Sequence, residues 1–221
     1  EELPVFVDIV INVLAVKGAE AVDYVTGRHM GFRAYLLQGF VKVDLITTDV
    51  AKAVKGADLV MLALPAYGVE TFAQACIPHL KDGQMVVLNM AATAGSLRFA
   101  LKAREIAPHL RIKVAELSSL TYAARKRDDG VEVLLRVQRL FFSAFPAADT
   151  PEMLQAFQAL YPAVVAGTHV LETTLNNGNP VTHPAGSMLN AGAIEFSKGD
   201  FCLYSQGISL GVARVIQAVD D

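Results

Sequence analysis

The sequence predicts an α/β protein built on a mostly parallel sheet, and three observations point to this fold class. Short apolar runs such as Leu59–Leu64 suit strands that are buried on both faces. Stretches of about a dozen residues that suit helices separate these runs, and strands alternating with helices form right-handed βαβ units. Hydrophobic residues make up 53% of the 221 residues and charged residues 19%, so the chain can bury a large core and intrinsic disorder is excluded.

Elements in the first half of the chain begin and end at residues typical of such boundaries. Leu45–Thr48 is predicted to be a short strand, and Asp49 is expected to cap a helix that Gly56 ends. Ser96 is expected to cap a basic amphipathic helix that continues to His109. The other predicted elements are strands over residues 59–64, 84–89 and 112–117 and a helix over residues 68–80. Residues 5–16 suit a strand by propensity or a helix by their polar face, and both remain open.

The second half of the chain changes from strands to helices. Val131–Phe142 follows a turn and is predicted to be a strand, interpreted as an antiparallel edge of the same sheet. Thr150 is expected to cap the next helix, with Pro151 as its first helical residue. The predicted elements that follow are a strand over residues 163–166 and helical segments over residues 170–176, 184–196 and 206–219. We therefore predict a Rossmann-like domain over residues 1–167 and the beginning of an all-helical domain over residues 168–221.

Composition narrows the class of protein. The net charge is −3, which gives no electrostatic basis for binding nucleic acid or an anionic membrane surface. The longest apolar stretch has about eight residues, against the roughly 20 that span a bilayer, and no secretory signal is expected. The two cysteines, Cys76 and Cys202, form neither a disulfide framework nor a zinc motif, and no metal site is expected. These features predict a soluble cytoplasmic protein.

The sequence lacks the common nucleotide-binding motifs and has a partial match to a hydrolase motif. No two of the 16 glycines are separated by a single residue, so the sequence contains no GxGxxG, and it contains no Walker A motif. Residues 207–211 match the GxSxG pattern of a serine hydrolase around Ser209. The order of catalytic residues in such hydrolases requires a histidine after the serine, and none follows Ser209 here. We therefore interpret the glycines as allowing a helix to pack closely.

Among the five histidines, His183 has the most polar surroundings. His79 and His109 stand near predicted helix ends, where a structural role is typical, and His29 and His169 have no polar companions in sequence. His183 follows the polar run 176–182 at a predicted turn before a helix. Asn179 is four residues earlier, so the two side chains would share a helical face. A catalytic role and a turn-capping role for this pair both remain open.

Two further segments are candidates for ligand contact. Arg125 lies in the basic triplet 125–127, which suits either a solvated loop or a carboxylate-binding site just after a strand's carboxyl end. Residues 89–95 end another strand with small side chains, which permits either a ligand to approach the backbone or a tight turn.

Four segments carry a resemblance to a known family. They are TTDVAKAVKGADLVMLALPA (47–66), DGQMVVLNMAATAG (82–95), AELSSLTYAAR (115–125) and NGNPVTHPAGSMLNA (177–191). In their order and spacing they resemble the NAD(P)-dependent opine dehydrogenases, the octopine/nopaline dehydrogenase family of the 6-phosphogluconate-dehydrogenase-like group. The last segment is the most specific, because the catalytic histidine of that family stands in an N-x-x-x-H-P context, which Asn179, His183 and Pro184 match.

The resemblance implies a reductive condensation. An α-keto acid such as pyruvate and the amine of an amino acid would form an imine, which NADH or NADPH reduces to a secondary amine. It implies His183 as the general acid/base and Asn179 as a residue that orients substrate. It places Thr93 and Ser118 near the substrate carboxylate, with Arg125 as a further substrate-binding candidate. Pro65, Asn89 and Glu116 would line the nicotinamide side.

The sequence departs from the family pattern at two places, and these leave alternatives. The glycine motif and the following acidic residue are missing, and residues 89–95 read NMAATAG where relatives read NPGxxGG. We therefore expect an incomplete Rossmann-like sheet, a chain lacking both ends of the family's enzymes, and dimerisation or aggregation through unpaired sheet edges. The alternatives are a related keto-acid reductase that needs no amine, a non-catalytic assembly module and, least favoured, a serine hydrolase.

Overall fold

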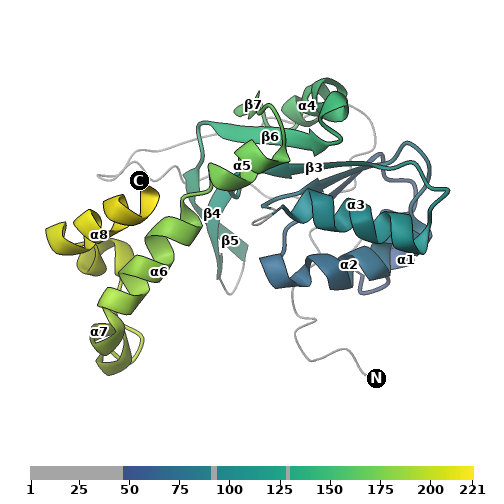
Figure 1. Cartoon of the computed structure of the whole chain (residues 1–221). Coiled ribbons are helices and arrows are strands. Elements are labelled where there is room, and N and C mark those ends of the chain that lie inside the picture. The colour runs from purple at the N-terminus through teal and green to yellow at the C-terminus, as the bar shows by residue number, and fades with distance from the viewer. Residues whose placement is uncertain (1–46, 91–93, 128–129) are drawn as a thin grey trace. The chain divides into compact units, whose positions relative to one another are not determined.

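The computed structural model describes residues 47–90, 94–127 and 130–221, and it has the predicted α/β class. The chain divides into two compact units. The first ends at Asn176, and residues 177–221 form the second (Figure 1). The first unit contains both sheets, and the second is helical. The predictions for residues 5–16 and for Leu45 and Ile46 lie outside the described residues, while Thr47 and Thr48 are not in a strand.

A five-stranded sheet forms the centre of the first unit. Its strands stand in the order β1-β2-β3-β6-β7, and three of its four pairings are parallel. Only the pairing of β6 with β3 is antiparallel. The bounds are β1 Leu59–Leu62, β2 Met85–Leu88, β3 Lys113–Leu117, β6 Leu140–Phe145 and β7 Val164–Ala166. The predicted apolar runs therefore do form strands, each up to two residues shorter at an end than expected.

Helices cover both faces of this sheet because successive side chains of its strands point to opposite faces. On one face, β1 and β2 pack against α1 (Val50–Val54), α2 (Val69–Cys76) and α3 (Gly95–Ile106), with Phe99 fully buried. On the other face, β3 and β6 pack against α4 (Thr150–Gln158) through Met153 and Phe157. Short 3₁₀ turns at Ala66–Gly68, Ile77–His79 and Ala147–Asp149 flank these helices.

The strand predicted over Val131–Phe142 is wrong in its extent and its place. The structure has two strands there, because β5 (Gly130–Arg136) ends before β6 begins at Leu140. β5 pairs with β4 (Tyr122–Arg127) as a separate antiparallel hairpin, while β6 lies inside the main sheet between β3 and β7.

The helix boundaries show which predicted caps form. Asp49 caps α1 by accepting a hydrogen bond from the Lys52 amide at 3.2 Å, as predicted. Ser96 does not cap α3, because the N-cap is Ala94 in a left-handed conformation with φ 54° and Ser96 lies inside the helix. Thr150 is the first residue of α4 rather than its cap, and its hydroxyl accepts from the Ala144 amide at 2.9 Å.

The chain after β7 is helical, as predicted. α5 (Val170–Leu175) belongs to the first unit. The second unit contains α6 (Asn179–Leu189), α7 (Ala191–Phe196), a π-helical turn (Leu203–Gly207) and α8 (Leu210–Asp220). The domain boundary near residue 168 stays a prediction. Among the described residues, no helix has both the length and the apolar character needed to cross a bilayer.

Candidate functional site

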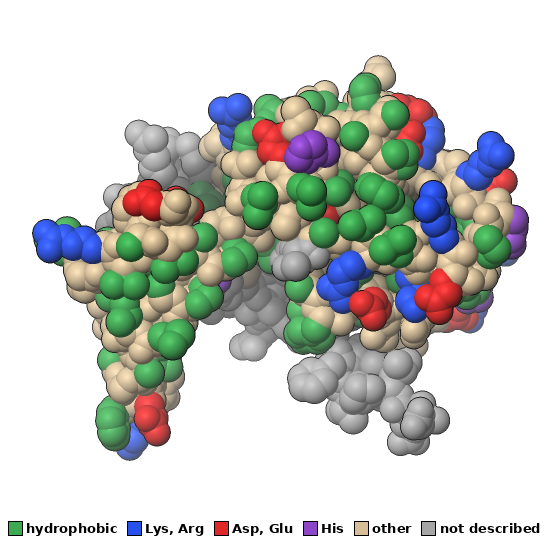
Figure 2. All heavy atoms as spheres, in the orientation of Figure 1, with side chains coloured by type: hydrophobic (Ala, Val, Ile, Leu, Met, Phe, Trp, Pro, Cys, Tyr) green, Lys and Arg blue, Asp and Glu red, His purple; other side chains and the backbone are tan. Residues whose placement is uncertain are grey.

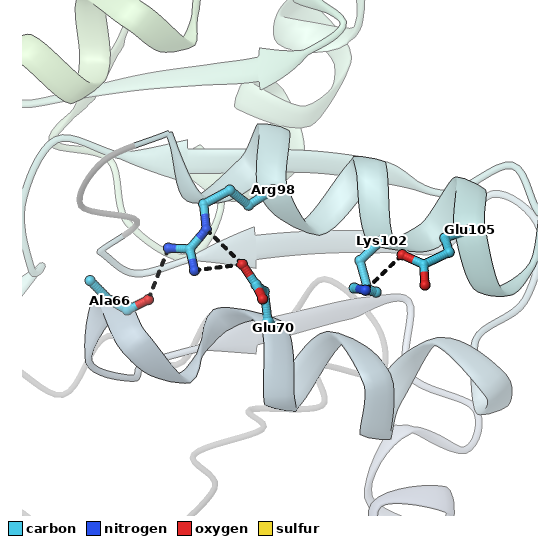
Figure 3. A network of polar contacts seen from close by, with 5 residues as sticks. All are labelled: Ala66, Glu70, Arg98, Lys102 and Glu105. Atoms are coloured by element: carbon cyan, nitrogen blue, oxygen red, sulfur yellow. Dashed lines mark hydrogen bonds and ion pairs between the residues drawn. The ribbon is translucent and has the colours of Figure 1, made fainter.

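The segment after β1 brings Pro65 to the carboxyl end of the sheet. Pro65 precedes a 3₁₀ turn, and its carbonyl accepts a hydrogen bond from the Gly68 amide at 2.8 Å. Arg98 of α3 holds this turn from outside (Figure 3). Its Nη1 donates to the Ala66 carbonyl at 3.2 Å, and its Nη2 donates to Glu70 Oε1 at 2.9 Å. These contacts link the start of α2 to α3 and fix the backbone next to Pro65.

Asn89 follows β2 at the same edge of the sheet and is 4% exposed. Its amide group makes two hydrogen bonds to Thr121, with Nδ2 donating to the hydroxyl at 3.0 Å and Oδ1 accepting from the backbone N–H at 3.1 Å. The Asn89 backbone N–H donates to Leu62 O at 2.8 Å. Asn89 therefore ties the ends of β1 and β2 to the segment after β3, at the edge where open α/β sheets bind ligands.

Glu116 of β3 lies in the interior, fully buried, and three donors contact its carboxyl group. Oε2 accepts from the Ser96 amide at 2.9 Å and from the Ser96 hydroxyl at 2.5 Å. Oε1 accepts from the Thr174 hydroxyl at 2.7 Å, and Thr174 Oγ1 in turn accepts from the Ala94 amide at 3.0 Å. A buried polar network of this kind is stable because its polar atoms have partners. It joins β3, the start of α3 and α5.

The three residues expected near a substrate carboxylate have different surroundings. Ser118, which is 5% exposed, exchanges hydrogen bonds with the Phe141 backbone and extends the pairing of β3 with β6. Thr93 lies outside the described residues. Arg125 lies in β4 of the hairpin, opposite Glu132 in register, so the alternative of a loop at this position is wrong. A strand forms there because residues 122–127 pair with residues 130–136.

His183 and Asn179 belong to the second unit and both lie on α6. The expected turn before a helix is wrong, because α6 begins at Asn179 and contains His183 in its second turn. Pro180 stands in the first turn, where a proline fits, and Pro184 is accommodated inside the helix. Asn179 and His183 are four positions apart in this helix, which places them on one face. His183 Nε2 lies 2.5 Å from the hydroxyl of Tyr204.

The other motif candidates have structural roles. Ser209 caps α8 by accepting from the Val212 amide at 3.3 Å, and a π-helical turn rather than a strand precedes it, which does not fit a hydrolase nucleophile. His169 has polar companions after all. Its Nδ1 accepts from the Glu172 amide at 3.1 Å and caps α5, while Glu172 accepts from the Thr168 hydroxyl at 2.6 Å. This bond from Thr168 lowers the pKa of Glu172.

A separate cavity of about 580 Å³ opens at the amino ends of β1 and β2, away from Pro65 and Asn89. Leu59, Met85 and Leu160 contribute apolar lining. The side chain of Gln84, which also lines it, already donates to Val54 O and Ala57 O and accepts from the Lys81 amide. In the part of the chain that the structure describes, no cluster of three or more His, Cys, Asp or Glu residues could hold a metal ion.

Sequence reasoning missed Ser96, Thr174, Arg98 and Tyr204. Glu116 is 20 residues from Ser96 and 58 from Thr174, and no local pattern connects residues so far apart. The sequence predicts Ser96 only as a helix cap. No local pattern connects Tyr204 with His183, which lies 21 residues earlier.

Comparisons with known proteins agree with this arrangement. A family model described as NAD/NADP octopine/nopaline dehydrogenase, alpha-helical domain, matches residues 166–221. The chain is 33% identical over 186 residues to an opine dehydrogenase from Arthrobacter sp. (strain 1C), an alignment that covers 83% of this chain and 51% of that protein. The chain thus spans about half the length of this curated relative.

Solved structures of octopine dehydrogenase are similar in both sequence and fold. One, with NADH and L-arginine, has a TM-score of 0.57 and 26% identity, covering 78% of this chain and 44% of that chain. Another, with NADH and pyruvate, has a TM-score of 0.56 and 27% identity, covering 69% of this chain and 39% of that chain. The chain is therefore similar to octopine/nopaline dehydrogenases in its helical segment, which the family model matches, and over about half the length of the curated relative.

Proposed function

We propose that this chain takes part in an NAD(P)H-dependent reductive condensation of an α-keto acid, such as pyruvate, with the amino group of an amino acid. The observation that carries the proposal is the placement of His183 and Asn179 on one face of α6, inside the segment that the family's helical-domain model matches. The solved relatives with NADH and L-arginine and with NADH and pyruvate support the same substrate classes.

The carboxyl edge of β1 and β2 fits one end of a nicotinamide coenzyme. Pro65 and Asn89 follow parallel strands there, where open α/β sheets bind their ligands, and both are held by surrounding contacts. We propose these two residues as contacts of the nicotinamide side and Glu116 as the group that supports this edge from the interior. When bound, NADH or NADPH would supply the hydride for the reduction.

His183 is the proposed general acid/base. Imidazole is the side chain that most often exchanges a proton near neutral pH, and here it would exchange one with the carbonyl-derived group of the substrate. Asn179 would orient the substrate through its amide. For the substrate carboxylate we propose Thr93, Ser118 and Arg125, since Ser118 Oγ accepts from the Phe141 amide and keeps its O–H as a donor, and a guanidinium can bind a carboxylate with two parallel bonds.

The direct test is oxidation of NADH and of NADPH by this chain in three mixtures: pyruvate alone, amino acids alone, and both together. The proposal predicts a rate that requires both substrates, because the reduced species is their imine. A rate with pyruvate alone would instead identify a keto-acid reductase. No rate in any mixture would contradict a catalytic function for this chain and leave a role in assembly.

We also propose that the protein is cytoplasmic and forms a homodimer. Within the described part of the main sheet, β1 stands at the end of the strand order and its four residues are Leu, Val, Met and Leu. An apolar strand edge favours pairing with another chain. Light scattering should therefore give twice the mass of one chain, and a monodisperse monomer would contradict the dimer.

A further inference from the structure

We propose that Tyr204 is a positioning residue for His183, holding the imidazole ring in one orientation. This inference rests on the proposed function of His183 as the general acid/base. Tyr204 lies in the π-helical turn, 21 residues after His183, and both residues belong to the helical unit. It does not require any contact between the two units.

The contact between the two side chains is both polar and aromatic. Tyr204 Oη lies 2.5 Å from His183 Nε2, and the ring centroids are 5.9 Å apart with the planes inclined by 64°. This edge-to-face arrangement is one that aromatic rings prefer. The hydroxyl therefore restrains one nitrogen, and the packing of the tyrosine ring restrains the rotation of the imidazole.

The turn that carries Tyr204 is fixed to α6 near His183. Asn190 Nδ2 donates both to Gly186 O at 2.8 Å and to Gly207 O at 2.9 Å, so one side chain links the helix to the end of the turn. Leu203 fits against Gly186, where an added Cβ would lie only 3.2 Å from Leu203 Cδ1. Gly186 is one helical turn after His183. These contacts bring Tyr204 to the histidine and leave the turn little room to shift.

A neutral imidazole has one nitrogen that donates and one that accepts, and the partner of one nitrogen decides the state of the other. Among the described residues, Tyr204 is the hydrogen-bond partner of His183, and no other group bonds to its ring. The Tyr204 hydroxyl, however, can both donate and accept, so it holds Nε2 in either tautomer and restrains the orientation of the ring. Partners that orient an active imidazole in this way affect activity without touching the reacting atoms.

The first arm of the test measures the two imidazole ¹⁵N resonances of His183 at a fixed pH in the full chain. Tyr204→Phe removes only the hydroxyl, so these two resonances should shift while those of the other four histidines stay in place. Ser197→Ala is the matched control, because it removes another exposed hydroxyl bond of the helical unit, to Ile194 O. Unchanged His183 resonances in Tyr204→Phe would overturn the proposal.

The second arm measures kcat and KM with both substrates. Tyr204→Phe should lower kcat about tenfold, the factor that one hydrogen bond typically supplies, with KM nearly unchanged. Wild-type kcat in Tyr204→Phe, together with loss of turnover in His183→Ala, would overturn the positioning role alone. Wild-type turnover in His183→Ala would overturn the proposed function instead, and the ¹⁵N resonances would still report the contact independently.

Discussion

The two units of this protein bury their apolar side chains to very different extents. Among the described residues, nearly all the buried hydrophobic side chains belong to the sheet unit, and Val212 is the one in the helical unit. The helical unit exposes Met188 by 78%, Phe196 by 83% and Leu210 by 73%. Figure 2 shows hydrophobic side chains gathered on the surface of these helices.

This difference shows where the stability of each unit comes from. The sheet unit has a packed cluster on each face of its main sheet, so its helices are stabilised by burial of their apolar sides. The helical unit is stabilised more by side-chain hydrogen bonds. Asn190 links α6 to the π-helical turn, and Ser209 caps α8. The candidate catalytic histidine of this unit is therefore held by local contacts, the hydrogen bond and ring packing with Tyr204, rather than by a large core.

The largest expected difference in the free energy of unfolding is between alanine variants of two phenylalanines, one in each unit. Phe99→Ala in the sheet unit should lower the free energy of unfolding by about 3–5 kcal/mol, because it empties a fully buried site between α3 and the sheet. Phe196→Ala in the helical unit should change it by less than about 0.5 kcal/mol, since the ring is 83% exposed. Urea unfolding of both variants measures this. Equal losses would mean that Phe196 is covered in solution and would contradict the comparison.

The two cysteines, one in each unit, should differ in their reactivity. Burial raises the pKa of Cys76 in the sheet unit to about 11, whereas a hydrogen bond with Ser205 lowers the pKa of the exposed Cys202. Because the thiolate is the reactive form, iodoacetamide at neutral pH should modify Cys202 at least about a hundredfold faster. Mass spectrometry of the labelled peptides gives both rates. In denaturant the rates should converge, and similar rates in the native protein would break the comparison.

The smallest expected changes in stability come from alanine at two glycines, one destabilising and one stabilising. An added Cβ at Gly167 would lie 2.5 Å from Ser143 Oγ and disturb its 2.7 Å bond with Thr173, so Gly167→Ala should cost about 1–3 kcal/mol. Gly192 lies in α7 with nothing within 4 Å of an added Cβ, so Gly192→Ala should stabilise by about 0.5–1 kcal/mol. Thermal unfolding measures both, and a stabilising Gly167→Ala would contradict the close packing.

The sequence was sufficient to predict the parallel part of the sheet. Apolar runs place β1, β2 and β3 correctly because strands buried on both faces leave no polar alternation. Asp49 and Gly56 were predicted as the ends of α1 because caps act locally, and Gly56 has the positive φ of 73° that favours glycine. Local chemistry at an element's ends is readable from neighbouring residues.

Tertiary contacts decided the features that sequence reasoning missed. β5 and β6 were predicted as one strand, because residues 131–142 contain no glycine or proline that would mark a break between them. Glu116 was selected by resemblance alone, whereas the polar run before His183 and the strand end at Asn89 also pointed to those two residues. Their partners Thr121, Thr174 and Tyr204 lie 21 to 58 residues away in sequence, and only the fold brings them together.

The central claim, that His183 of the less buried unit performs the proton transfer, is tested most directly by His183→Ala. With pyruvate, amino acids and NAD(P)H present, the account predicts that kcat falls about 10²–10⁴-fold, the usual contribution of a general acid/base. Binding of NAD(P)H, followed by its fluorescence, should stay nearly unchanged, because the proposed nicotinamide contacts lie in the sheet unit. Turnover close to that of the wild-type chain would remove His183 from the mechanism and contradict the account.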